Sequence, residues 1–199
     1  MHPNPLFRTE DRALIERLVE QVGFGMVFLT IPDGPRVAHT PILMTSDNRL
    51  QFHLARHNAL SPHLDGAQAL VTVNGPDGYV SPRWYDNRDT VPTWDYAAVE
   101  IEGNVRAMTY AELEQFLHAV IEKHEERIAG ERWEATETNA QLWDRLAKGI
   151  TGFEMTITAL RPTLKLSQKK SPEERQRIAN GHAENGSGDL AEFMMGIAR

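Results

Sequence analysis

Apolar residues recur along this chain in two patterns, and each pattern predicts one kind of element. Short apolar or alternating runs bounded by Pro, Gly, Asn and Asp are typical of β-strands. The predicted strands are residues 26–31, 37–44, 50–54, 69–73, 98–108 and 153–159. Because tight turn signals separate the first three, we expect them to form an antiparallel meander. Pro41 interrupts the second strand, which indicates a sheet edge or a bulge at that position.

Apolar residues at helical spacing predict helices before, between and after the strands. The predicted helices are residues 9–22, 109–128 and 139–148, a short one within 55–64, one that starts at Ser171 and Pro172, and a terminal one over 190–197. Thr9 is the expected N-cap of the first helix, and Thr109 with Glu112 forms a capping box for the longest. Gly, Asn and Ser are frequent in residues 180–189, which predicts a flexible linker there.

The order of these elements predicts a mainly β protein with helices, of the α+β class. About six strands, mostly antiparallel, with helices before, between and after them are typical of a β-barrel with helical decoration. We expect residues 1–166 to form the barrel domain with its helical insertions, and residues 167–199 to form a C-terminal helical tail.

One stretch fits neither pattern and is unusually aromatic. Residues 79–96 hold two Trp, three Tyr and two Pro in eighteen positions. Such a loop on a rigid scaffold is typical of a ligand pocket or a subunit interface. The alternative is that these rings only cap a core, and composition leaves both interpretations open.

Composition excludes several classes of site and favours a soluble protein. The 199 residues include no Cys, which excludes disulfides, thiolate metal sites and Cys nucleophiles. The formal charge of −7 argues against broad nucleic-acid binding, which depends on phosphate neutralisation. No apolar run approaches the roughly 20 residues of a membrane span, and the first residues lack a signal pattern. We therefore expect a cytoplasmic protein with no membrane partner.

The sequence lacks the common motifs of catalytic, metal-binding and nucleotide-binding sites. His39, His53, His57 and His63 occur within 25 positions, but their spacing fits no strong metal signature, so no metal site is expected. The chain has no Gly-x-Ser-x-Gly elbow, no dinucleotide fingerprint and no P-loop. The alternative to a metal site is that these imidazoles lie at the surface or face a cofactor.

Arg56, His57 and Asn58, with Ser61 nearby, form the strongest candidate for a binding site. A guanidinium beside the amides of a helix start suits a phosphate, and Lys169 with Lys170 offers further positive charge. The alternative is a solvated basic turn. A phosphate cradle together with an aromatic wall suits a phosphorylated aromatic ligand, and flavin mononucleotide (FMN) has that shape.

Several strings of residues resemble the PaiB-type family of FMN-binding negative transcriptional regulators. The similarity runs over most of the chain and is strongest in Tyr79-Val80-Ser81-Pro82-Arg83-Trp84-Tyr85 and Val91-Pro92-Thr93-Trp94-Asp95-Tyr96. It also includes residues 38–41, 52–58 and 165–168. The family usually has Asn at the position of Asp95, so this chain keeps the shape of that side chain and adds an acid.

The resemblance implies a fold, a cofactor and a set of contacts. The fold is the FMN-binding split β-barrel of the pyridoxamine-phosphate-oxidase-like type, which forms homodimers with FMN at the subunit interface. The implied phosphate contacts are Arg56, His57 and Asn58, while His39 and Thr40 would face the flavin ring and Lys169 would add a contact. Trp84, Tyr85 and Trp94 either reach the flavin across the dimer or seal the interface.

Two functions of different classes follow from the resemblance. The first is a flavin-binding negative transcriptional regulator; no helix-turn-helix is recognisable, so contact with DNA would need the basic segment 165–177 or a partner protein. The second is an FMN-dependent oxidoreductase acting on an unknown small molecule. No catalytic residue is identified, although His39 and His57 are candidates because imidazole titrates near neutral pH. A third possibility is a structural dimer that has lost its cofactor site. The presence of Arg56 argues against it.

Overall fold

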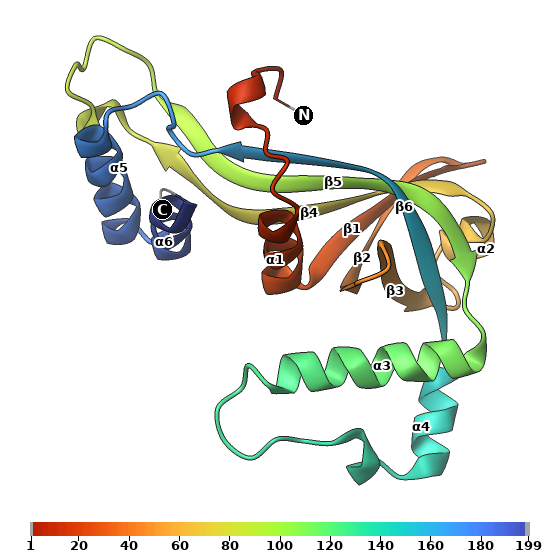
Figure 1. Cartoon of the computed structure of the whole chain (residues 1–199). Helices are drawn as coiled ribbons and strands as arrows, with labels where there is room; N and C mark the ends of the chain where they lie inside the picture. The colour runs from red at the N-terminus through yellow and green to blue at the C-terminus, as the bar shows by residue number, and fades with distance from the viewer. Residues whose placement is uncertain (1, 198–199) are drawn as a thin grey trace. The chain divides into compact units, whose positions relative to one another are not determined.

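The computed structural model describes residues 2–197, and its six strands form one closed barrel (Figure 1). The strands are β1 (Phe24–Ile31), β2 (Gly34–Thr45), β3 (Arg49–Ala55), β4 (Gln68–Val80), β5 (Thr93–Ala107) and β6 (Ile150–Lys165). Around the barrel they follow the order β1-β2-β3-β6-β5-β4. The predicted mainly β fold with helices is confirmed, and so is the antiparallel meander of β1, β2 and β3.

Helices precede, interrupt and follow the strands. The α-helices are α1 (Arg12–Val22), α2 (Ser61–Leu64), α3 (Tyr110–Glu125), α4 (Ala140–Ala147), α5 (Pro172–Glu184) and α6 (Gly188–Ile197). Short 3-10 helices are η1 (Pro5–Phe7), η2 (Pro82–Trp84) and η3 (Ala135–Glu137). None of the helices in this described part of the chain has the length and apolar character needed to cross a membrane.

Capping residues in the sequence predicted most helix starts correctly. Thr109 and Glu112 form the predicted capping box of α3, and the Ser171 hydroxyl accepts a hydrogen bond from the Glu174 amide at the start of α5. The first helix differs, because α1 begins at residue 12 and Asp11 Oδ1 accepts from the Leu14 amide at 3.0 Å. The expected cap, Thr9, instead accepts a hydrogen bond from the Asp11 amide before the helix starts.

Three sequence-based expectations were wrong in detail. The aromatic stretch is less irregular than predicted, because residues 79–80 end β4 and residues 93–96 begin β5. Residues 180–189 are not one flexible linker, since α5 runs to residue 184 and α6 starts at 188. Pro41 does not mark a sheet edge, because the barrel is closed. It is the last residue of β2 that pairs with β1, and pairing with β3 begins at the next residue, so the missing N–H falls where β2 changes partners.

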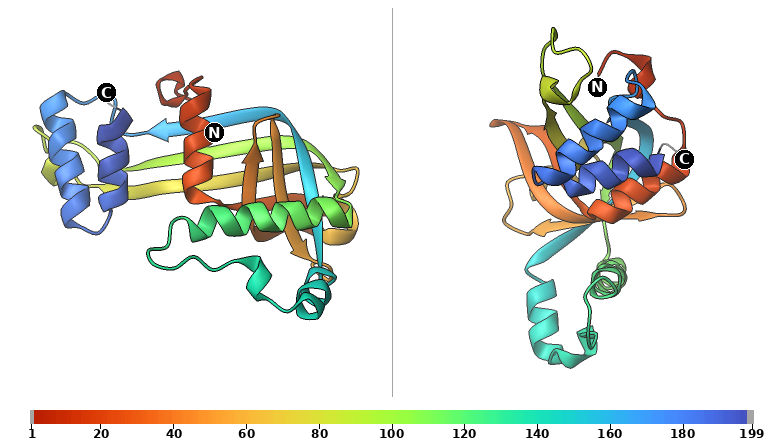
Figure 2. Two further views of the ribbon diagram at one scale, coloured as in Figure 1. Left: turned by 60° about the horizontal axis from the view of Figure 1, so that its bottom comes forward. Right: turned by 90° about the vertical axis from the view of Figure 1, so that its left-hand side faces the viewer.

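The described residues divide into two compact units. The barrel unit comprises residues 19–73 and 100–160 and holds a segment of every strand together with α3 and α4. The terminal unit comprises the described residues of 1–18, 74–99 and 161–199. It holds residues 74–80 of β4, 93–99 of β5 and 161–165 of β6. It also holds α5 and α6, and these two helices pack side by side (Figure 2).

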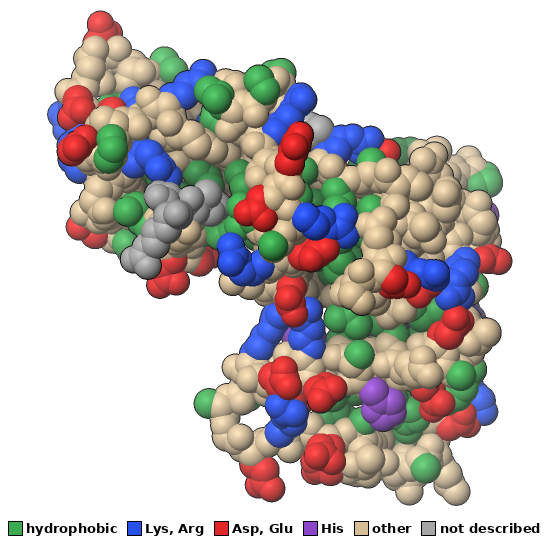
Figure 3. All heavy atoms as spheres, in the orientation of Figure 1, with side chains coloured by type: hydrophobic (Ala, Val, Ile, Leu, Met, Phe, Trp, Pro, Cys, Tyr) green, Lys and Arg blue, Asp and Glu red, His purple; other side chains and the backbone are tan. Residues whose placement is uncertain are grey.

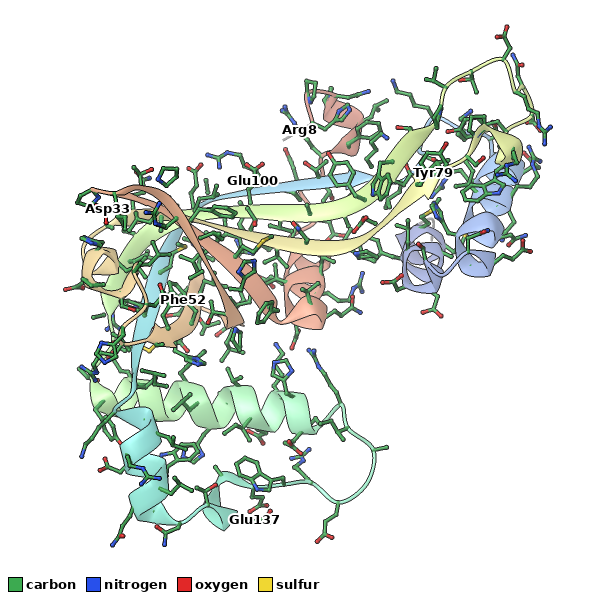
Figure 4. All side chains as sticks on the ribbon, turned by 180° about the vertical axis from the view of Figure 1, so that it is seen from behind. Arg8, Asp33, Phe52, Tyr79, Glu100 and Glu137 are labelled. Carbon is green, nitrogen blue, oxygen red and sulfur yellow. The ribbon has the colours of Figure 1, made fainter. Side chains whose placement is uncertain are left out.

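Each unit has an apolar core of its own. In the barrel unit, Phe52 and Phe153 are fully buried and stacked with ring centroids 5.5 Å apart; Figure 4 labels Phe52 on β3. In the terminal unit, Ile178 of α5 and Leu190 and Met194 of α6 are buried completely. This burial explains why the Gly- and Asn-rich segment is ordered: apolar side chains on both sides of it pack within one unit.

Close contact between β5 and β6 requires a glycine at residue 103. A Cβ at this position would lie 2.3 Å from the Thr156 carbonyl oxygen and 2.4 Å from Cγ of Met155. The nearer atom belongs to the backbone, so it cannot move aside as a flexible side chain would. A side chain at residue 103 would therefore push β5 and β6 apart at this point.

We expect Gly103→Ala to lower the free energy of unfolding by about 3 kcal/mol, because the added methyl group overpacks the contact between the two strands. Gly188→Ala is the matched control, since a Cβ there meets no atom within 4 Å. Its effect should stay within about 0.5 kcal/mol. Urea unfolding of both variants measures the difference. Equal stability of Gly103→Ala and the parent protein would contradict the close approach of β5 and β6.

Candidate functional site

The turn after β3 presents the predicted phosphate ligands. Arg56 is exposed, and its Nε donates to the Lys148 carbonyl at 2.8 Å, which joins the end of β3 to the start of β6. The backbone N–H of Arg56 also donates to the Gly149 carbonyl, at 2.9 Å. His57 is exposed and Asn58 is half-buried, with its Oδ1 accepting from the Leu60 amide. The barrel unit thus fixes the backbone of the turn and leaves its basic groups at the surface.

The donor groups of this turn fit a phosphate. An arginine has five N–H donors, and the Nη1 group of Arg56 makes no hydrogen bond within residues 2–197. The amide nitrogen of Asn58 and the exposed His57 add further donors. Residues 55–60 contain no acidic side chain that would repel an anion. The phosphate group of FMN matches this donor set in charge and in chemistry.

His39 and Thr40 point to opposite sides of β2. Thr40 is buried at 1% exposure, and its hydroxyl donates to the His53 carbonyl at 2.5 Å, so it helps to hold β2 against β3. His39 is exposed on the outer face and lies opposite Met26 in the β1–β2 ladder. Of these two predicted ring contacts, the side chain of His39 alone is presented on the outside of the barrel.

The outer face around His39 is apolar. Phe24, Phe28 and Val37 are 48%, 37% and 44% exposed, although large apolar side chains of this kind are usually buried. Phe28 lies opposite Val37, and Met26 lies opposite His39, so these side chains form one continuous patch on β1 and β2. We call it the β1–β2 outer face. A patch of this kind on a soluble protein commonly marks a contact with a ligand or another chain.

Trp84 and Lys169 belong to the terminal unit, whereas the other five predicted contacts belong to the barrel unit. The ring of Trp84 packs closely on the backbone of α5, because a Cβ at Gly181 would lie 2.3 Å from its Cε2 atom. Lys169 is exposed. Its neighbour Lys170 places Nζ 3.6 Å from the centre of the Tyr85 ring and pairs with Glu174 at 3.1 Å.

Two of the strings that carry the family resemblance, residues 91–96 and 165–168, meet in the terminal unit around Asp95. This carboxyl group is buried at 1% exposure, and its Oδ2 accepts a hydrogen bond from the Ser167 hydroxyl at 2.6 Å. Lys165 donates from its ammonium group to the carbonyl of Trp94 and the hydroxyl of Thr93. The strings 91–96 and 165–168 therefore form one structural feature, although about 70 residues separate them in the chain.

Burial raises the pKa of Asp95 above its usual value of 3.8, although the hydrogen bond from Ser167 and the charge of Lys165 act in the opposite direction. The other carboxyl oxygen, Oδ1, is buried and has no hydrogen-bond partner among the described residues. The folded state therefore binds this proton more tightly than the unfolded chain does. Asp95 contributes most to stability below pH 3.8, and the contribution is lost as the pH rises through the folded-state pKa.

We expect Asp95→Asn, which introduces the residue that the family resemblance implies at this position, to raise the free energy of unfolding at pH 7 by roughly 1 kcal/mol, because it removes a poorly solvated charge. The difference from the parent protein should shrink as the pH falls towards the usual pKa of the carboxyl group. Thermal and urea unfolding between pH 4 and pH 8 measure this. An Asp95→Asn protein that is less stable than the parent at pH 7, or a difference that does not depend on pH, would contradict the account.

His182 is a site residue that sequence reasoning missed. It is 2% exposed on α5, its ring meets Trp84 edge to face at 5.2 Å, and its Nε2 has no hydrogen-bond partner in the described chain. Nothing in the local pattern could have singled it out, because it lies in the segment that composition assigns to a linker. Only the packing of α5 against η2 brings it to the aromatic stretch.

Comparisons with known proteins support the fold and the family. In structure, the chain resembles an FAD and heme binding protein from Mycobacterium smegmatis, with a TM-score of 0.62 at 15% identity, over 85% of this chain and 78% of that one. The flavocytochrome Anf3 from Azotobacter vinelandii also gives a TM-score of 0.62, at 16% identity, over 87% and 77% of the two chains. At these identities the likeness concerns the fold alone, and the predicted split β-barrel is confirmed.

In sequence, the chain is 28% identical over 177 residues to "Protease synthase and sporulation protein PAI 2" of Bacillus subtilis, which covers 83% of this chain and 81% of that protein. A family model described as "Putative FMN-binding domain" matches residues 1–159, which is most of the chain. The predicted cofactor, FMN, is thus the cofactor in the description of the family. The chain belongs to this PaiB-type family of FMN-binding domains.

Proposed function

We propose that the protein is a homodimer that binds FMN and acts as a negative transcriptional regulator of the PaiB type in the cytoplasm. The observation that carries the cofactor site is the turn of Arg56, His57 and Asn58, whose donors are fixed at the surface by the barrel unit. Arg56 and His57 hold the phosphate, and Asn58 donates from its amide group. His39 lies beside the flavin ring on the β1–β2 outer face. Bound FMN supplies redox chemistry, accepting and giving up hydride or single electrons.

The apolar character of the β1–β2 outer face supports the dimer. Burying Phe24, Phe28 and Val37 against a second copy removes apolar surface from water, which is the main driving force of association between subunits. His39 lies within the same face, so a flavin ring beside it would also meet the partner subunit. Cofactor binding and dimerisation are therefore expected to strengthen one another.

The charges of the C-terminal segment favour regulation through a partner protein over direct contact with DNA. Lys170 pairs with Glu174, Arg177 pairs with Asp86, and Arg175 donates to the Met194 carbonyl at 3.1 Å. These bonds occupy groups that phosphates would need. On the face shown in Figure 3, acidic and basic side chains are interspersed and form no broad basic surface.

An FMN-dependent oxidoreductase is the second candidate function. The exposed His39, which lies beside the proposed ring position, favours it, because the two ring nitrogens of an imidazole can donate and accept a proton. Sustained turnover of a nicotinamide electron donor by the FMN-loaded protein, at a rate above that of free FMN, would favour the enzyme over the regulator.

Arg56→Ala should weaken FMN binding about tenfold or more, because a hydrogen bond between charged groups contributes about 1.5–3 kcal/mol. Quenching of FMN fluorescence measures the affinity. Arg36→Ala is the control, since Arg36 is also exposed in the barrel unit and, among the described residues, its side chain donates only to the neighbouring Pro35 carbonyl. Thermal unfolding of both variants checks that the lost bond to Lys148 has not unfolded the turn. Unchanged affinity in a folded Arg56→Ala protein would remove Arg56 from the site.

Phe28→Glu should shift the protein towards monomer by at least about tenfold in dissociation constant, because a charge would be buried in the proposed interface. Sedimentation velocity over a range of concentrations measures the shift. Leu146→Glu is the control, since Leu146 is 61% exposed on α4 and is not part of the β1–β2 outer face. A monomeric parent protein, or a dimer that Leu146→Glu disrupts and Phe28→Glu does not, would refute the proposed interface.

A further inference from the structure

The terminal unit contains a pocket that the proposed FMN contacts do not use. Its volume is about 390 Å³, within the roughly 300–1,000 Å³ typical of small-molecule sites. Its aromatic walls are Tyr79 at the end of β4, Trp84 in η2 and Trp94 in β5, and His182 of α5 also lines it. Figure 4 labels Tyr79, which lies close to α5 and α6 of the same unit.

Packing fixes the aromatic walls of this pocket. The Trp94 indole N–H donates to Asp77 Oδ1 at 2.7 Å, and the ring of Tyr79 meets that of Trp94 edge to face at 6.2 Å. Trp84 packs against the backbone at Gly181. Because these rings are held before any ligand arrives, a flat aromatic ligand would lose little free energy to the ordering of the pocket.

His182 lines the pocket and has an unsatisfied polar atom. The residue is only 2% exposed, and its Nε2 lacks a hydrogen-bond partner among residues 2–197. Burial lowers the pKa of His182, so the imidazole is neutral at pH 7. A buried polar atom without a partner is costly, and a ligand group that pairs with it regains that free energy.

Arg83 carries a positive charge at the pocket, and Asp77 carries a negative one. Oδ1 of Asp77 accepts the hydrogen bond from the Trp94 indole, which holds this carboxylate at the Trp94 wall of the pocket. The guanidinium of Arg83 is exposed at the pocket and makes no hydrogen bond or ion pair within the described part of the chain. An anionic group on the ligand would therefore find a partner in Arg83.

We propose that this pocket binds a small planar aromatic or heteroaromatic carboxylate as a second ligand besides FMN. Trp84 and Trp94 contact the ring, Arg83 binds the carboxylate, and Nε2 of His182 pairs with a polar atom of the ligand. On this account Trp84 contributes to the second ligand site. The protein would then respond to an aromatic acid, which is a signal that a regulator without direct DNA contact can pass to a partner.

Calorimetric titration with indole-3-acetate and tryptamine tests the proposal, because these probes share a ring and carry opposite charges. Indole-3-acetate should bind at least about tenfold more tightly than tryptamine, as expected for a charge-assisted contact. Arg83→Gln should abolish that preference. Arg88→Gln is the matched control, since Arg88 is exposed in the same loop and does not line the pocket. His182→Phe keeps an aromatic ring beside Trp84 and should weaken indole-3-acetate several-fold.

Several outcomes would overturn the proposal. They are no binding of indole-3-acetate at millimolar concentration, tighter binding of tryptamine, or equal effects of the Arg83 and Arg88 substitutions. The titration is run with flavin-free protein and again with saturating FMN. Displacement of indole-3-acetate by FMN would show that the pocket belongs to the flavin site and would refute a second ligand. Since the flavin-free titration does not depend on FMN, failure of the proposed FMN site leaves this test intact.

Discussion

The contact of β5 with β6 at Gly103 is the constraint on which the barrel depends. Here a backbone carbonyl and the side chain of Met155 occupy the space that any other residue would need. Closure places β6 next to β3, and the carbonyls of Lys148 and Gly149, which directly precede β6, then hold the turn after β3. The candidate phosphate ligands are thus positioned by backbone groups that a closed barrel brings together from more than 90 residues away.

Some buried polar groups of this protein have hydrogen-bond partners, and others keep an atom without one. Glu154 is 6% exposed and accepts hydrogen bonds from Arg49, Gln51 and Arg106, so its charge is fully accommodated in the barrel unit. Asp95 and His182 in the terminal unit each keep a buried atom without a partner among the described residues. Unsatisfied groups of this kind are uncommon in folded proteins and are often found where a ligand binds. Tyr79, Trp84 and Trp94 of the aromatic stretch line a pocket together with His182, and this is the basis of the second ligand site proposed above.

The periodicity of apolar residues and the capping residues predicted the helices and strands. Contacts between residues distant in the chain determined the features that were not predicted. Alternation at residues 98–105 identified β5, and the Thr109 capping box identified α3, because both signals act between near neighbours. Both C-terminal helices were predicted, but the run of α5 through residues 180–184 was missed, since Leu190 and the residues of α5 are stabilised by each other and not by their own composition. The turn at Arg56 was found from residue types alone, but the burial of Thr40 and the pairing of Asp95 with Ser167 depend on partners far away in the chain.

The absorption spectrum of the purified protein, recorded before and after a titration with FMN, tests the central claim most directly. The account predicts flavin bands in the protein as isolated, or saturable binding of added FMN with one site per chain. A protein that is colourless and leaves the spectrum and fluorescence of FMN unchanged at all concentrations would contradict a flavin site at the turn of Arg56, His57 and Asn58. The closed barrel would remain, but its exposed basic turn would be a solvated one.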